Sequence, residues 1–175
     1  MSAVRFIIRW WVAFAFLAAA GALATAHAFE TFGGLAPCHL CLKQREIFWA
    51  AIAVSLPATV WALFFRSRGT PKLAALLLFG VFTAGLVIAT FHAGVEMKWW
   101  KGPASCTGSG GGGIDMSVMK ALMAGKHVAV PMCDVIAWQW GGLTMSGWNA
   151  IASGILALLS LVASIRRKSD APRAD

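Results

Sequence analysis

Two cysteines and an arginine close together in the chain are the residues best suited to carry out chemistry. Cys38 and Cys41 are three residues apart, and Arg45 follows four residues after the second thiol. Two thiols at this spacing can close into a reactive disulfide or share a metal ion. On a helix, Arg45 would lie on the same face as Cys41 and would favour its thiolate, as would the positive end of the helix. We therefore predict redox chemistry at this site.

A second pair of cysteines, Cys106 and Cys133, lies much later in the chain. One interpretation is a structural disulfide that closes a long loop and stabilises the fold. The other is a second redox pair. Cys106 lies between an extended Pro-Ala-Ser segment and a glycine-rich tether, and such flanks suit a sulfur that must meet a partner protein. The spacing alone leaves both interpretations open.

Two further ionisable groups lie four residues apart, His92 and Glu96. On a helix they would form a simple side-chain pair. The histidine could instead donate a hydrogen bond to a bound quinone or carry a proton. Asp134, next to Cys133, is interpreted only as a solvated loop charge.

The composition indicates an integral membrane protein. Of the 175 residues, 59% are hydrophobic, and the mean hydropathy is +0.71. Four apolar runs are each close to the roughly 20 residues that cross a bilayer as a helix. The sequence predicts an all-α membrane protein, a single domain built as a four-helix transmembrane bundle. The predicted spans are residues 10–29, 47–65, 73–91 and 143–165.

The net charge of +8 does not indicate a nucleic-acid partner, because the basic residues flank the apolar spans. Cytoplasmic loops of membrane proteins are enriched in Lys and Arg. This predicts that both termini are cytoplasmic and that residues 30–46 and 92–142 form outer loops. All four cysteines then lie outside, which indicates an oxidising compartment. The basic groups are Arg5 and Arg9; Arg66, Arg68 and Lys72; and Arg166, Arg167 and Lys168.

Ala26-His27-Ala28 resembles a signal-peptidase site after an apolar run. Cleavage there would leave three spans and place the new N-terminus outside. We favour an uncleaved first helix, because the run is long for a signal sequence.

Local signals refine the connections. Pro37 suits the first turn of the second helix, and Pro57 is expected to kink that helix. Residues 115–124 are expected to form a short amphipathic helix in the long outer loop, either packed on the protein or lying on the bilayer. Tryptophans are expected to anchor the outer surface of the bundle, namely Trp99, Trp100, Trp138, Trp140 and Trp148.

The ordered set of these motifs resembles the DsbB family of bacterial disulfide-bond formation proteins. The resemblance covers nearly the whole chain, and the ordered set is far more specific than Cys-x-x-Cys alone. The matching stretches are Pro37–Cys41 with Arg45, Phe91–Glu96, Trp100–Pro103 leading to Cys106, Cys133–Asp134 with Trp138, and Gly142–Asn149. No chemical role follows for Glu96, Asp134 or Gly142–Asn149. The glycine-rich insert after Cys106 departs from some relatives.

The resemblance implies a thiol:quinone oxidoreductase in the bacterial inner membrane, with no metal. A reduced DsbA-like periplasmic thiol oxidase would attack a Cys106–Cys133 disulfide at Cys106, and the electrons would pass by exchange to Cys38–Cys41. Cys41 would then transfer them to ubiquinone or menaquinone. Arg45 is similar in position to the family's quinone-site arginine, and His92 to a quinone-pocket histidine.

Three alternatives to this function are another enzyme, a transporter subunit and a metal-binding protein. A vitamin K epoxide reductase-like enzyme also uses a Cys-x-x-Cys beside a quinone, but its active pair usually comes late in the chain. A small transporter subunit with structural disulfides would usually carry an ionisable residue in mid-span, which the predicted spans lack. A metal-binding membrane protein could use all four thiols.

Overall fold

The computed structural model describes residues 3–64, 70–103, 123 and 132–165. Within them, four helices are long and apolar enough to cross a membrane, and the short α1 (Ala3–Arg9) precedes them. This confirms the predicted all-α membrane fold with four spans. The expected helix at 115–124 lies outside the described residues, except for Met123. The four long helices are α2 (Trp11–Thr31), α3 (His39–Phe64), α4 (Lys72–Glu96) and α6 (Met145–Ile165).

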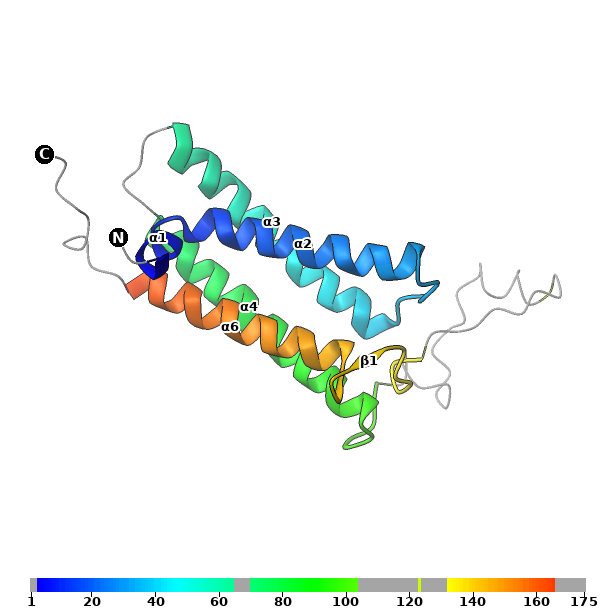
Figure 1. Ribbon diagram of the computed structural model, residues 1–175. Helices are drawn as coiled ribbons and strands as arrows, with labels where there is room; N and C mark the ends of the chain where they lie inside the picture. The colour runs from blue at the N-terminus through cyan, green and yellow to red at the C-terminus, as the bar shows by residue number, and fades with distance from the viewer. Residues whose placement is uncertain (1–2, 65–69, 104–122, 124–131, 166–175) are drawn as a thin grey trace, which may run out of the picture.

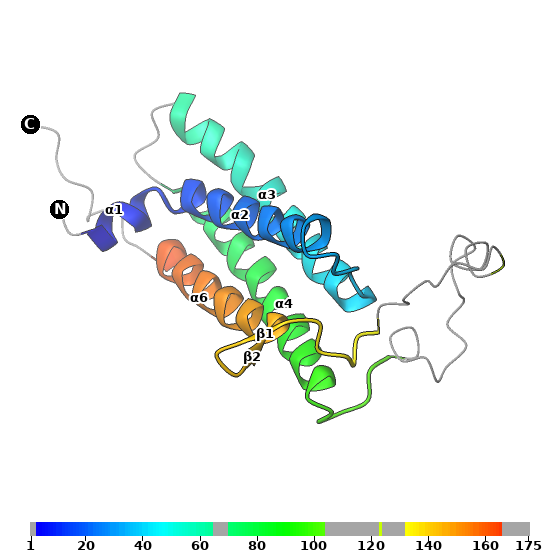
Figure 2. The same ribbon diagram turned by 45° about the vertical axis from the view of Figure 1, so that its right-hand side comes forward.

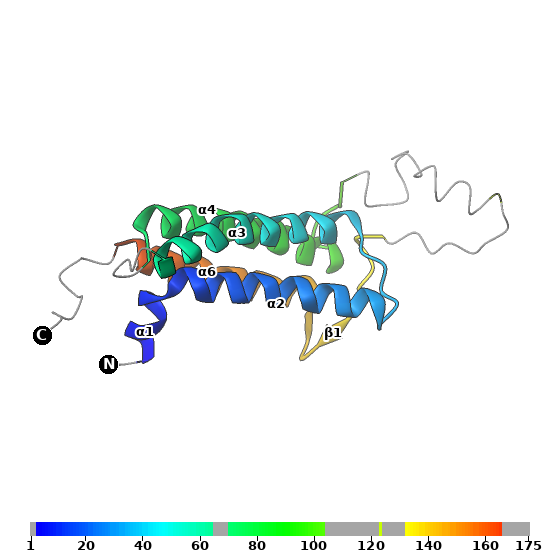
Figure 3. The ribbon, with the colours of Figure 1, turned by 90° about the horizontal axis from the view of Figure 1, so that it is seen from above.

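The bundle consists of two closely packed helix pairs (Figures 1 and 2). Helix α4 runs along α6, and α2 runs along α3, with α3 and α4 joining the pairs. Seen from above, α1 and the last turn of α6 lie at one end of the bundle. The start of α3 and the end of α4 lie at the other (Figure 3). The cysteine-bearing segments are therefore far from α1.

At the α1 end, the chain before α4 is attached to the end of α1. The Thr70 N–H donates to the Arg9 carbonyl at 3.0 Å, two residues before Lys72 begins α4. Arg9 and Lys72, from two of the basic groups, thus lie at the same end of the bundle, as the predicted topology requires.

Small side chains fill the interior of the bundle. Without a strong hydrophobic force between helices in lipid, close packing of small residues holds membrane helices together. Larger side chains such as Leu78 and Phe82 are buried between them, and the Trp11 indole N–H donates to Ser160 Oγ at 2.9 Å. Many large apolar side chains point outward, as a lipid-facing surface requires. The buried small residues include Ala15, Ala19, Ala51, Ser55, Ala75, Ala89, Ser153, Ala157 and Ser160.

The helices extend beyond the predicted spans on the cysteine side. Helix α3 begins at His39, well before the predicted residue 47, and α4 continues to Glu96 instead of ending at residue 91. Hydropathy marks the lipid-embedded part of a helix, whereas backbone hydrogen bonding continues through polar residues. Pro37, expected inside the helix, lies just before it, and Pro57 lies within α3 as expected.

The fourth predicted span starts in a strand rather than in a helix. Gln139–Trp140 (β1) pairs antiparallel with Leu143–Thr144 (β2). Between them, Gly141 and Gly142 have φ values of 59° and 80°, which suits a two-residue hairpin turn that few other residues can adopt. Thr144 then caps α6, because its hydroxyl accepts the Gly147 N–H at 3.2 Å. The hairpin fixes where α6 starts.

Candidate functional site

The Cys38 and Cys41 thiols meet at the N-terminus of α3. Both are free, and their sulfurs lie 2.8 Å apart. Cys38 is buried, whereas Cys41 is partly exposed. A small movement is therefore enough to close or open a disulfide here.

Cys38 acts as the capping residue of α3. Its sulfur accepts the Cys41 N–H at 3.3 Å, and its carbonyl accepts the Leu42 N–H at 3.0 Å. The hydrogen bond between the two thiols, followed by burial, raises the pKa of the Cys38 thiol. The Cys38 thiol can therefore donate the hydrogen bond between the two sulfurs, and such a bond would stabilise a thiolate at Cys41.

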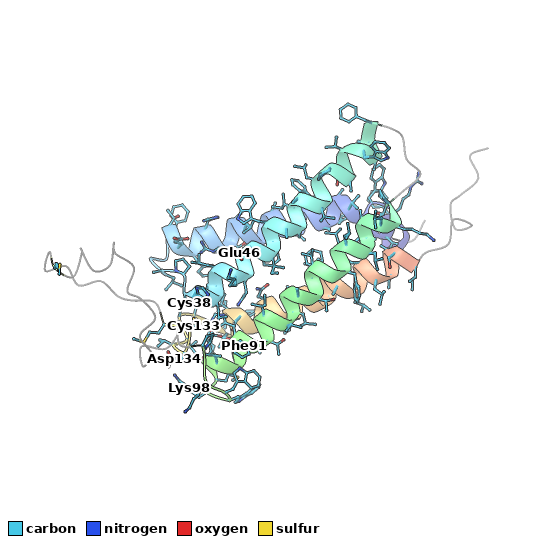
Figure 4. All side chains as sticks on the ribbon, turned by 180° about the vertical axis from the view of Figure 1, so that it is seen from behind. Cys38, Glu46, Phe91, Lys98, Cys133 and Asp134 are labelled. Carbon is cyan, nitrogen blue, oxygen red and sulfur yellow. The ribbon has the colours of Figure 1, made fainter. Side chains whose placement is uncertain are left out.

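A third cysteine lies against this pair (Figure 4). Cys133 is disulfide-bonded and belongs to the same small apolar cluster as Cys38, Cys41 and Val95. Cys106 lies outside the described residues, so its predicted pairing with Cys133 stays a prediction. The cluster brings a dithiol and a disulfide together although their cysteines are far apart in sequence.

His92 lies where the sequence predicted chemistry, and it is 2% exposed. Its Nε2 is 3.6 Å from the Cys38 sulfur and 3.9 Å from a Glu96 carboxylate oxygen. The Cys133 backbone also lies within hydrogen-bonding reach of the ring. The expected pair with Glu96 is present, but the contact with the thiol is shorter.

Sequence reasoning missed the residues that hold this histidine. Gln44 on α3 places its amide nitrogen 2.7 Å from His92 Nδ1. Asn149 on α6 donates to the Gln44 side-chain oxygen. Neither residue is ionisable, and in sequence each resembles an ordinary polar residue near a helix end. What could have drawn attention to them is their position in the sequence, within the stretches that resemble the DsbB family.

Glu96 is buried and has a partner of its own. The Ser146 hydroxyl donates to the Glu96 carboxylate, and Thr144 Oγ1 lies 3.0 Å from Ser146 Oγ. A buried carboxylate needs such donors, because an unpaired charge away from water is strongly unfavourable. The segment Gly142–Asn149, which had no predicted role, thus supplies side chains to both Glu96 and Gln44.

Arg45 does not contact the thiols. Its guanidinium lies 2.6 Å from a Glu30 carboxylate oxygen and donates to the Ala26 carbonyl at 3.3 Å, both on α2. It still lies one helical turn after Cys41, near enough for its charge to act on that sulfur. Glu30, which the sequence did not single out, neutralises part of this charge.

The segment after Cys133 is tied to the end of α4. Lys98 donates to Asp134 at 2.6 Å and lowers the pKa of that carboxyl. Lys98 has φ 60°, in a helix-ending turn closed by hydrogen bonds from Lys98 to Val95 and from Trp99 to Gly94. Asp134 is therefore more than a solvated loop charge. Figure 4 shows Cys38, Cys133, Asp134 and Lys98 at one end of the bundle.

Comparison with known proteins decides the family. A family model described as "Disulfide bond formation protein DsbB" matches residues 8–163. The chain belongs to the DsbB family. Proteins named "Disulfide bond formation protein B" are similar to it over most of their length. The one from Marinobacter nauticus is 31% identical over 169 residues, covering 92% of this chain and 94% of the relative.

Two further relatives agree with this assignment. The protein from Idiomarina loihiensis is 32% identical over 152 residues, covering 86% of this chain and 81% of its own. The protein from Xanthomonas axonopodis pv. citri is 32% identical over 162 residues, covering 88% and 90% respectively. No solved structure matches the chain.

Membership of the DsbB family makes this chain a multi-pass membrane protein of disulfide bond formation. It confirms the resemblance drawn from the ordered cysteine motifs. It also sets aside the vitamin K epoxide reductase-like and transporter alternatives. The Cys38 and Cys41 thiols at the start of α3 lie beside the disulfide-bonded Cys133 in this protein.

Proposed function

We propose that this protein is a thiol:quinone oxidoreductase of the bacterial inner membrane that reoxidises a DsbA-like periplasmic dithiol protein. The partner's two thiols become a disulfide and release two electrons and two protons. A bound ubiquinone or menaquinone takes up both to become the quinol. The active cysteines face the periplasm in this proposal, and the basic end of the bundle faces the cytoplasm.

The electrons follow two successive thiol–disulfide exchanges. A partner thiolate attacks Cys106 of a Cys106–Cys133 disulfide, which gives a mixed disulfide between the partner and Cys106 and releases Cys133 as a thiolate. The partner's second thiol then attacks the mixed disulfide, so that the partner leaves with its own disulfide and Cys106 becomes a thiol. Exchange with the oxidised Cys38–Cys41 pair then restores the first disulfide and leaves Cys38 and Cys41 as thiols. Cys41 donates the electrons onward, and the Cys38–Cys41 disulfide forms again.

One observation supports this route above the others. Cys133, already disulfide-bonded, packs in one apolar cluster with the free thiols Cys38 and Cys41. Exchange requires the attacking sulfur to reach the disulfide in line, so two sulfur pairs must lie close together. A purely structural disulfide has no need of this neighbour.

The helix turns that follow Cys41 suit a flat, lipid-soluble acceptor. Leu42 and Trp49 on α3 are 45% and 57% exposed, so both present apolar surface outside the bundle. Arg45, on the same helix, can donate hydrogen bonds to a carbonyl oxygen and stabilise negative charge. His92 remains a candidate for the same pocket or for carrying protons.

A metal-binding function has one observation in its favour. The ligand atoms of Cys38, Cys41 and His92 lie within 4.8 Å of one another. Zinc accepts thiolate and imidazole ligands, and a structural site requires four. This candidate predicts that the reduced protein binds zinc and that its oxidase activity depends on a metal.

The deciding experiment uses the purified protein with a reduced DsbA-like protein and ubiquinone, and follows quinone absorbance. We expect Cys41→Ser to abolish quinone reduction. Cys106→Ser should block the partner's oxidation, while small dithiols still reduce the Cys38–Cys41 pair. A chelator should have no effect. Activity that needs a metal, or that persists without Cys41, contradicts the proposal.

A further inference from the structure

Four polar side chains form a continuous line from α6 to the dithiol. They are Ser153, Asn149, Gln44 and His92, and the proposed electron route does not use the first three. Ser153 is 1% exposed and Gln44 is 8% exposed. Polar groups this deeply buried need hydrogen-bond partners. Here they hydrogen-bond to one another, so the donor and the acceptor of each hydrogen bond can be assigned.

The first hydrogen bond of the line lies within α6. The Ser153 hydroxyl donates to the Asn149 side-chain oxygen at 3.5 Å. The Asn149 amide nitrogen therefore faces Gln44 and donates to its oxygen. With that oxygen engaged, the Gln44 amide nitrogen is the atom that faces His92 Nδ1, at 2.7 Å.

An amide nitrogen can only donate a hydrogen bond, so His92 Nδ1 must accept it. A neutral imidazole that accepts at one nitrogen carries its proton on the other. The His92 proton is thus on Nε2. This nitrogen lies 3.6 Å from the Cys38 sulfur and 3.9 Å from a Glu96 carboxylate oxygen, and the Cys133 backbone is also within hydrogen-bonding reach of the ring. Of these neighbours, the Cys38 sulfur is the one hydrogen-bonded to Cys41. The remaining step of the line is the hydrogen bond between the Cys38 and Cys41 sulfurs, 2.8 Å apart.

We propose that Gln44, held by Asn149, is a positioning residue that fixes His92 with its proton on Nε2, so that this N–H donates to the Cys38 sulfur. Cys38 in turn gives its own hydrogen bond to Cys41. Every donor in the line then points toward Cys41, and the line stabilises negative charge there. This inference rests on the proposed function, in which Cys41 passes the electrons onward.

The same tautomer opposes metal binding by this cluster. A histidine binds a metal through a nitrogen lone pair, and the nitrogen that faces the thiols here carries a proton. By holding this proton on Nε2, Gln44 favours His92 as a hydrogen-bond donor to the thiols and disfavours it as a metal ligand. The geometry accounts for why two thiols and an imidazole can lie together and still serve sulfur chemistry.

The test is the protonation state of His92, measured by ¹⁵N NMR on histidine-labelled reduced protein. The His92 signals are identified by their loss in His92→Gln. We expect Nδ1 without a proton and Nε2 with one at pH 8. In Gln44→Glu a carboxylate replaces the donor, so Nδ1 should become protonated. A proton on Nδ1 in the unmodified protein, or no change in Gln44→Glu, overturns the inference.

Kinetics test the consequence for the reaction. Gln44→Met keeps the length of the side chain but cannot donate, and we expect kcat for quinone reduction to fall about tenfold with an unchanged KM for the partner. Asn149→Ala, which does not touch His92, should lower kcat in the same direction and serves if Gln44→Met does not fold. Unchanged kcat and ¹⁵N signals in both variants contradict the proposal. If the unmodified protein reduces no quinone, the proposed function fails. The ¹⁵N measurement still tests which nitrogen of His92 carries the proton.

Discussion

At the scale of single residues, Arg45 is the side chain whose partner changes its interpretation most. Its guanidinium pairs with Glu30 on α2 rather than with a thiol. In the proposed function it still has donors available for an acceptor beside Cys41. Its effect should therefore appear in binding of the acceptor more than in exchange between sulfurs.

Arg45→Ala should raise the apparent KM for ubiquinone about tenfold or more, because a charge-assisted hydrogen bond is lost. The KM for the reduced partner protein should not change. Steady-state rates with varied quinone measure both. Lys43→Ala is the matched control, since Lys43 lies on the same helix and, among the residues that the structure describes, forms an ion pair only with exposed Glu46. An unchanged quinone KM in Arg45→Ala would refute this role.

The sequence predicted the reactive residues of the site but not their supports. Thiols and a histidine are rare and chemically distinctive, so Cys38, Cys41 and His92 stood out. Gln44, Asn149 and Ser146 are neutral polar residues, and only the packing of α3, α4 and α6 gives them partners. No spacing rule within one segment predicts contacts between helices that lie far apart in the chain.

At the scale of elements, the end of α4 depends on a glycine. A Cβ at Gly94 would lie 2.0 Å from Trp100, whose indole N–H donates to the Phe91 carbonyl at 2.9 Å. Gly94→Ala must therefore displace that tryptophan, and we expect a loss of about 1–3 kcal/mol. Thermal unfolding in detergent measures it.

Gly80→Ala on the same helix is the control, because nothing lies within 4 Å of a Cβ there. It should be neutral or stabilising by about 0.5–1 kcal/mol. Equal stability of the two variants would show that Trp100 does not pack on Gly94.

The Lys98–Asp134 pair joins the end of α4 to the segment after Cys133. Its stabilising effect should depend on pH, because Lys98 lowers the pKa of Asp134. The effect is full above the unfolded pKa of about 3.9, and it disappears as the pH falls through the lower folded value. Lys98→Met should therefore lower Tm at pH 7 but by less near pH 2, well below the unfolded pKa. An equal difference at both pH values would contradict this role.

Hydropathy predicted the apolar parts of the four long helices but not the residues at which the helices begin and end. The polar residues from 39 to 46 reduce the hydropathy of α3 without interrupting its hydrogen bonds. The hairpin before α6 was missed because each of its strands has only two residues. Gly141-Gly142 was its signal, but the apolar run after it was assigned wholly to the fourth span.

At the scale of the whole molecule, the proposed orientation follows from the basic end of the bundle. The Arg9–Thr70 hydrogen bond places two connections at the end opposite the cysteines. In the proposed topology that end is cytoplasmic. A single reagent that does not cross membranes can test both ends.

In intact cells, a cysteine introduced at Ser67 or Ser169 should resist an impermeant maleimide and react only after permeabilisation. Cys41 in reduced cells should react in both cases. Each protein tested carries a single cysteine, with Ser at every remaining native cysteine position. Labelling of Ser67→Cys from outside would reverse the orientation.

The central claim is that electrons leave a partner dithiol through Cys38–Cys41 and reduce a quinone. The most direct measurement mixes the quinone-loaded protein with a limiting amount of a reduced DsbA-like protein, without oxygen. It counts the disulfides and the quinol formed. We predict one quinol for each partner disulfide, and none in Cys38→Ser or Cys41→Ser. Partner oxidation without quinol, or quinol in either serine variant, would contradict the account.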